Sequence, residues 1–327
     1  MLAGDAPAWR TSPPGRRDSR MEIYLPIAQI SVDWLVILAM GVGVGFLSGM
    51  LGVSGGFITT PLLIFYGIPS SVSVATQASP VAAASLVGAI GKNSQHSVDY
   101  KMGFTLLCGG LAGSAIGVDI FRYLQKLGQI DVVVELSYVL LLGSVGGIML
   151  RESVQAFLAA RRGAPVSFQK PGQHTWIHRL PFKTRFRRSR LYISIIPVVV
   201  LGFLVGIMTA ILGTGGAFLV IPAKLYLLRM RTNLAVGTSQ FQIFIVASMT
   251  TLMHATVDHT VDIVLAFLLI FGGVVGAQFG SGVGAKLRGE QLRLVFAMLT
   301  LLIAIQLVIR LLHTPSDIYS VLAAPLG

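Results

Sequence analysis

The chain has few charged residues and a single cysteine. Of its 327 residues only 12% are charged, whereas 54% are hydrophobic and the mean hydropathy is +0.77. One soluble core of a chain this long does not have room for so much apolar material. The lone Cys108 excludes an intrachain disulfide and argues against a thiolate metal site. Because it lies inside an apolar segment, we expect its thiol to serve in packing.

The sequence also lacks a nucleotide-binding motif and an apolar leader. GxxxxGK[ST] does not occur, so we expect neither ATP hydrolysis within this chain nor a cofactor. Residues 1–20 are polar and proline-rich without an apolar run, so we expect no secretory signal there. Since Met21 also fits a start codon, this leader is interpreted either as a disordered tail or as sequence upstream of the true start.

Long apolar runs, in contrast, fill most of the chain. Most of them reach the roughly 20 residues that cross a bilayer core, which predicts an all-α polytopic membrane protein. Two runs, 53–66 and 213–228, are too short. The ten predicted segments are 33–52, 53–66, 71–91, 102–121, 132–150, 192–212, 213–228, 234–254, 261–283 and 291–311.

Positive charge concentrates between Arg151 and Arg190, where Glu152 is the only acid among many arginines and lysines. A short basic stretch between apolar spans is typical of a cytoplasmic loop, with anionic lipid head groups as its neighbours. We favour this interpretation over nucleic-acid binding. The predicted organisation is a leader (1–20), a first transmembrane repeat (21–150), a basic cytoplasmic loop (151–190), a second repeat (191–313) and a tail (314–327).

The two halves on either side of this loop resemble each other. "GVGVGFLSGMLGVSGGFITTP" (41–61) aligns without a gap with "GFLVGIMTAILGTGGAFLVIP" (202–222), and "GGLAGSAIG" (109–117) matches "GGVVGAQFG" (272–280) at all four glycines. Each half has about five segments, so if all of them cross, the second half is inverted relative to the first. The distribution of lysine and arginine favours this arrangement over two parallel halves in which the short segments re-enter.

Both halves carry a glycine-rich break beside the short segment. Inverted repeats with such breaks indicate a transporter's substrate site, because a helix that begins there offers unpaired N–H groups and the positive end of its dipole to an anion. The predicted substrate-binding residues at the breaks are Gly52, Ser54, Gly55, Gly56, Gly213, Thr214, Gly215 and Gly216. Close helix packing is the alternative explanation, and we favour it for "GGLAGSAIG".

Polar residues in the following segment of each half extend the predicted binding site. They are Thr76 and Gln77 in the first half and Thr238, Ser239 and Gln240 in the second. Hydroxyl and amide groups in a membrane helix either line a cavity or bond a neighbouring helix. The sequence leaves both alternatives open.

Three further features have plain explanations as well as functional ones. His96 with Asp99, and His254 with Asp258, are spaced as a metal pair or proton relay would be, but we favour solvated loops whose aspartates cap the next helix. Lys224 has no basic counterpart in the first half, and we expect it to reach the membrane interface. No metal site is predicted.

"GFLSGMLGVSGGFITTPLLIFYGIP" (45–69), "VATQASPVAAASLVGAI" (74–90) and "GGLAGSAIG" resemble the TauE/SafE sulfite exporter family. The resemblance covers about residues 21–311 and implies a multi-pass protein of the bacterial inner membrane. It also implies a secondary transporter of a small anion such as sulfite, an organosulfonate or a related organic anion. Ser54 and Ala217 depart from the commoner GxGGG form, which leaves the substrate open. A membrane-embedded metal-handling protein or enzyme using the His/Asp pairs is the alternative.

Overall fold

The computed structural model describes residues 22–51, 55–94, 97–161, 182–186, 188–189, 191–216, 220, 223–224, 228, 230, 232–284 and 289–312. The predicted leader 1–20 and tail 314–327 lie outside these residues, as do Gly52, Ser54, His96 and much of the basic stretch.

Helices in the described part follow the predicted apolar runs closely. They are α1 (Trp34–Leu51), α2 (Gly56–Phe65), α3 (Ser70–Ser94), α4 (Tyr100–Lys126), α5 (Ile130–Arg161), α6 (Ile195–Leu212), α8 (Thr232–Met253) with the π-helical turn η2 (His254–Asp258), α9 (Ile263–Gly284) and α10 (Gly289–Leu312). Five of them are long and apolar enough to cross a membrane, so the mostly helical membrane fold is confirmed.

Helix lengths set which elements can span. The ten residues of α2 extend about 15 Å, roughly half of a bilayer core. The helix is therefore too short to cross a bilayer core alone. At the other extreme, α5 continues to Arg161, beyond the predicted end of the apolar run at residue 150.

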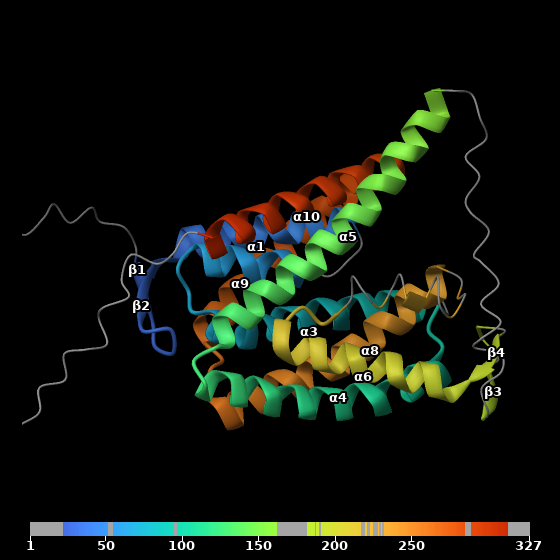
Figure 1. The fold of residues 1–327 in the computed structure, drawn as a ribbon, viewed down its shortest axis with the longest axis horizontal. Coiled ribbons are helices and arrows are strands. Elements are labelled where there is room, and N and C mark those ends of the chain that lie inside the picture. The colour runs from blue at the N-terminus through green and yellow to red at the C-terminus, as the bar shows by residue number, and fades with distance from the viewer. Residues whose placement is uncertain are drawn as a thin grey trace, which may run out of the picture.

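Two antiparallel hairpins, which the sequence did not predict, precede α1 and α6. β1 (Glu22–Leu25) pairs with β2 (Ile30–Asp33), and β3 (Lys183–Phe186) pairs with β4 (Leu191–Ser194). The β1–β2 hairpin lies at one end of the helical bundle and the β3–β4 hairpin at the opposite end (Figure 1).

The first hairpin gathers the starts of α3 and α9. The backbone N–H of Ile27, in the turn after β1, donates to Asp262 Oδ2 at 3.2 Å, and the backbone N–H of Asp262 donates to Thr76 Oγ1 at 3.0 Å. Asp262 also caps α9, since its Oδ1 accepts from the N–H groups of Val264 and Leu265.

The second hairpin gathers the starts of α4 and α8 in the same way. Ser189, in the turn before β4, donates from its N–H and its hydroxyl to Asp99 Oδ2 at 2.9 and 2.6 Å, and the N–H of Asp99 donates to Thr238 Oγ1 at 3.0 Å. Consequently α3 starts beside one hairpin and α8 beside the other. These two helices pack together and run in opposite directions.

The most extensive helix–helix contacts join one half of the chain to the other. α1 packs along α9, and α4 packs along α6. Glycines make this approach possible: a Cβ added at Gly276 or Gly280 of α9 would fall on the carbonyl oxygens of Val42 and Phe46 in α1.

The "GGLAGSAIG" stretch of α4 faces α6 equally closely. A Cβ added at Gly109 or Gly113 would fall on the carbonyl oxygens of Val199 and Phe203, and one at Gly117 would lie 2.8 Å from the Ala210 Cβ. The packing interpretation of this motif is therefore confirmed.

Cys108 lies on the outer side of α4, and its thiol is exposed rather than packed in the interior. The expectation of a packing role was wrong because α4 buries its glycine face against α6, which turns Cys108 outward.

Candidate functional site

The break after α6 is a tight run of left-handed glycines. Gly213 ends the helix with φ +68°, and Gly215 and Gly216 follow with φ +66° and +61°, a conformation that only glycine adopts without strain. Between them Thr214, which is buried, accepts a hydrogen bond from the Gly216 N–H at 3.2 Å. The buried Tyr138 of α5 donates from its hydroxyl to the Leu212 carbonyl at 2.6 Å and holds the end of α6 in place.

The first break meets the second. Gly55 is the N-cap of α2 and Gly56 its first residue. A Cβ added at Gly56 would lie 3.2 Å from the Thr214 Cα, so the start of α2 rests against the backbone of the other break. The two glycine-rich segments therefore meet at Gly56 and Thr214, while Gly52 and Ser54 lie outside the described residues.

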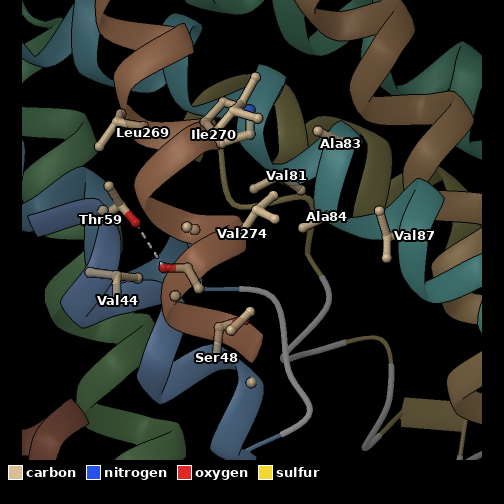
Figure 2. Close-up of a pocket in the computed structure, with 18 of the residues that line it drawn as sticks. Val44, Ser48, Thr59, Val81, Ala83, Ala84, Val87, Leu269, Ile270 and Val274 are labelled. Carbon is tan, nitrogen blue, oxygen red and sulfur yellow. Dashed lines mark hydrogen bonds between the residues drawn. The ribbon is translucent and has the colours of Figure 1, made fainter. Parts of the chain in front are cut away.

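A cavity of about 410 Å³ opens beside Gly55 and Gly56 (Figure 2). Its walls come from α1, α2, α3 and α9, with Gln240 contributed by α8. Most of the lining is apolar or glycine, as Val44, Val81 and Val274 illustrate. On the α2 side of the cavity the Thr59 hydroxyl donates to the Gly55 carbonyl at 3.2 Å.

The polar residues of α3 and α8 divide between the two roles that the sequence left open. Thr76 and Thr238 bond neighbouring elements, since each accepts the backbone N–H at the start of another helix. Gln77 and Gln240 line the cavity, and the amide oxygen of each is buried without a hydrogen-bond partner among the described residues. Ser239 belongs to neither group and faces Lys224 instead.

Lys224 does not reach the membrane interface, as the sequence had suggested, but is completely buried. Its Nζ donates to Ser239 Oγ at 2.9 Å and to Gln242 Oε1 at 3.1 Å. The expectation was wrong because α8 provides two polar acceptors inside the bundle, which a count of charges along the sequence does not reveal.

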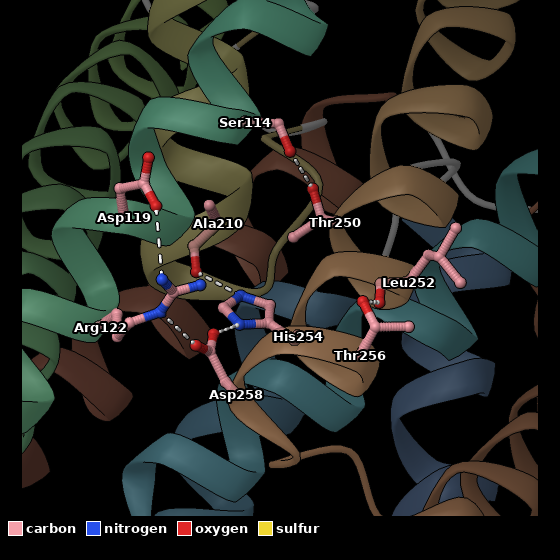
Figure 3. A network of polar contacts seen from close by, with 9 residues as sticks. All are labelled: Ser114, Asp119, Arg122, Ala210, Thr250, Leu252, His254, Thr256 and Asp258. Atoms are coloured by element: carbon pink, nitrogen blue, oxygen red, sulfur yellow. Dashed lines mark hydrogen bonds and ion pairs between the residues drawn. The ribbon is translucent and has the colours of Figure 1, made fainter.

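His254 and Asp258 form a buried network with α4 and α6 (Figure 3). His254 Nδ1 lies 2.8 Å from Asp258 Oδ2, and its Nε2 lies 3.1 Å from the carbonyl oxygen of Ala210. Arg122 Nε donates to Asp258 Oδ1 at 3.2 Å. Both ring nitrogens therefore face acceptors, an arrangement that imidazolium satisfies with two N–H donors. The network ties η2 to α6 three residues before Gly213.

These contacts correct the interpretation of the His/Asp pairs as solvated loops. His254 is completely buried and the side chain of Asp258 is 1% exposed. Asp258 caps no described helix; its place as a cap is taken by Asp262. Asp99 does cap α4, because its Oδ1 accepts the Met102 N–H at 3.2 Å, but this carboxylate is buried rather than solvated.

No group of three or more His, Cys, Asp or Glu side chains within the described ranges is arranged to hold a metal ion. His254 and Asp258 are instead bonded to each other, to Arg122 and to the Ala210 carbonyl. The geometry therefore gives the metal-handling alternative no specific support.

Comparison with known proteins identifies the family. The family profile described as "Sulfite exporter TauE/SafE" matches residues 37–307. The chain is 26% identical over 275 residues to "Probable membrane transporter protein YjnA" of Bacillus subtilis (strain 168), covering 83% of this chain and 98% of that protein. It is 28% identical over 286 residues to a "Probable membrane transporter protein" of Xylella fastidiosa (strain 9a5c), covering 84% and 95%. No solved structure matches the chain significantly. With a family match over most of its length, and relatives named as transporters rather than enzymes, this chain belongs to the sulfite exporter TauE/SafE family of membrane transporters.

Proposed function

We propose that the protein is a secondary transporter that moves sulfite, an organosulfonate or a related small anion across the bacterial inner membrane by alternating access. The observation that carries this proposal is the contact between Gly56 and Thr214, which joins the two glycine-rich breaks beside the cavity. Substrate sites of secondary transporters lie where broken helices from two repeats meet near the bilayer midplane.

The cavity suits a small anion whose charged group is joined to a compact or apolar remainder. Gly56 begins α2 beside this cavity, and the helix dipole favours a negative charge at a helix start by about 0.3–1 kcal/mol, or about 2 when partly buried. Gln77 and Gln240 add side-chain amides that can present either oxygen or N–H to a ligand. A volume of about 410 Å³ is ample for sulfite or a short sulfonate.

We propose further that the two halves form an inverted repeat. Support comes from three arrangements: the hairpins lie at opposite ends, α3 and α8 run antiparallel, and the pairing of α1 with α9 is mirrored by that of α4 with α6. The basic stretch 151–190 then lies on the cytoplasmic side near anionic head groups.

Flux into proteoliposomes tests the proposed function. Purified protein is reconstituted, and uptake of sulfite, sulfate, thiosulfate and a panel of sulfonates is followed with imposed pH or voltage gradients. We expect saturable uptake of at least one sulfur-containing anion, competed by its congeners and absent from protein-free vesicles. Uptake of none of them, or activity that depends on a chelatable metal, would contradict the proposal.

A further inference from the structure

Lys224 is completely buried, and its described partners are neutral. Its ammonium group donates to the hydroxyl of Ser239 and the amide oxygen of Gln242, both on α8. A charge buried among neutral groups is costly unless an opposite charge lies close by. This cluster therefore raises the question of which group compensates a positive charge on Lys224.

Among the residues that the structure describes, no carboxylate is paired with Lys224. No Asp or Glu occurs in the sequence between Glu152 and Asp258, so α6, α8 and the stretch that joins them contain none. Of the acids on neighbouring elements, Asp258 is bonded to His254 and Arg122, and Asp119 lies 3.9 Å from Arg122.

Asp99, at the start of α4, is likewise committed. Its two carboxylate oxygens accept hydrogen bonds from Met102 and Ser189. Within the described residues, Lys224 therefore has no carboxylate partner, which leaves its amino group available to an anion that is not part of the protein.

Hydrogen-bond donors around Lys224 point to the same conclusion. An ammonium group only donates, so the Gln242 amide must turn its oxygen toward Lys224 and its NH₂ away. That Nε2 atom is buried and has no acceptor among the described residues. The third ammonium N–H and the Ser239 hydroxyl hydrogen are donors beside it, so three kinds of donor share one buried location.

Gly110 of α4 lies beside these donors. A Cβ added at Gly110 would lie 2.8 Å from Val246 Cγ2 and 3.7 Å from Gln242 Nε2, so the side chain of Val246 also borders this position. Ser239 is also the immediate neighbour of Gln240, which lines the cavity. The three cluster residues do not themselves line that cavity, but Ser239 is next in sequence to a residue that does.

We propose that Lys224, Ser239 and Gln242 form an anion-binding subsite, in which Lys224 supplies the positive charge that the substrate oxyanion meets during transport. This inference rests on the proposed function, because it names the group in the second half that recognises the anion. Charge-assisted hydrogen bonds of this kind are about twice as strong as neutral ones, and they discriminate anions from neutral molecules.

Two substitutions and one control test the subsite in purified protein in detergent. Lys224→Met removes the charge while keeping an unbranched side chain, and Gln242→Glu places a carboxylate beside the ammonium group as an internal substitute for the anion. Lys101→Met removes a lysine that lies outside the cluster, where its Nζ donates to the Arg185 carbonyl. The thermal midpoint is measured while sodium sulfite, sodium sulfate or sodium chloride is added.

We expect sulfite to raise the thermal midpoint of the wild type and of the control variant Lys101→Met. In Lys224→Met and Gln242→Glu the apparent Kd for sulfite should rise roughly tenfold or more. Without sulfite, both variants should be at least as stable as the wild type, since each relieves an uncompensated buried charge. A response of the wild type to chloride alone, lost in both variants, would support the anion subsite while contradicting sulfite as its ligand.

Wild-type affinity for sulfite in Lys224→Met would overturn the inference. If that variant does not fold, wild-type affinity in Gln242→Glu overturns it equally. Sulfite flux, measured in parallel, distinguishes failure of the subsite from failure of the proposed function. If the wild type and both variants transport sulfite equally well, the protein is a sulfite transporter without this subsite. No response of the wild type to any of the three anions also overturns the subsite, whereas the transport proposal is then decided by flux.

Discussion

Replacing Gln77 with leucine should make the protein more stable and a poorer transporter at once. Gln77 is 3% exposed, and its amide oxygen has no partner among the described residues. An unsatisfied buried polar group costs about 1–3 kcal/mol, and leucine of similar size removes that cost. At roughly 2–4 °C per kcal/mol, the thermal midpoint should rise by several degrees.

Transport should change in the opposite direction, because the amide is then unavailable to the ligand. Loss of one hydrogen bond of about 1 kcal/mol predicts an apparent KM several-fold higher. Ser85→Ala is the matched control. Ser85 lies on the same helix and is completely buried, and its hydroxyl has no partner in the described part of the chain, but it does not line the cavity. This control should gain stability and keep the wild-type KM.

Both quantities are measured on the same preparations, the midpoint by tryptophan fluorescence in detergent and KM by flux into proteoliposomes. If Gln77→Leu lowers the midpoint and flux falls only in proportion to folded protein, Gln77 holds helices together and the reasoning is refuted. Unchanged KM with a raised midpoint would equally remove Gln77 from the substrate's path.

Other expectations concern helix contacts and topology. Thr76→Val and Thr238→Val each remove the acceptor of a buried N–H at a helix start, so each should lower the free energy of unfolding by about 1–3 kcal/mol in urea titrations. Gly213→Ala should reduce the monodisperse yield sharply, because φ is +68° there and a Cβ would fall on an α3 carbonyl. Cysteines at the exposed Tyr24 and Tyr192 of a cysteine-free protein should react differently with an impermeant maleimide in whole cells: position 24 labelled, position 192 protected. Equal labelling would contradict the inverted arrangement.

Most helix positions could be predicted from the sequence because most helices follow an apolar run of membrane length. The bounds of α1 and α9, for example, differ from the predicted runs by only one or two residues. The hairpins were missed because their strands are four residues each, too short to show an alternating pattern beside much longer apolar runs.

Parts of the candidate site could not be predicted because they depend on contacts between distant segments. The sequence interpretation treated His96 with Asp99 and His254 with Asp258 as similar pairs. The shift that aligns "GGLAGSAIG" with "GGVVGAQFG" instead pairs Asp99 with Asp262, and Asp262 has the equivalent contacts. Lys224 was assigned to the interface because lysines near helix ends usually lie there. The absence of any acid between Glu152 and Asp258 was the available signal that this lysine differs.

The pairing of α1 with α9 has a consequence for how the protein is made. During synthesis α1 enters the membrane long before α9 exists, with the glycine face that α9 will cover still open to lipid. The first half cannot reach its final packing as an independent unit, and the same holds for α6, whose partner α4 comes from the first half. Assembly of this transporter is therefore completed only after the last third of the chain has left the ribosome, and separately expressed halves would need each other in the membrane in order to fold.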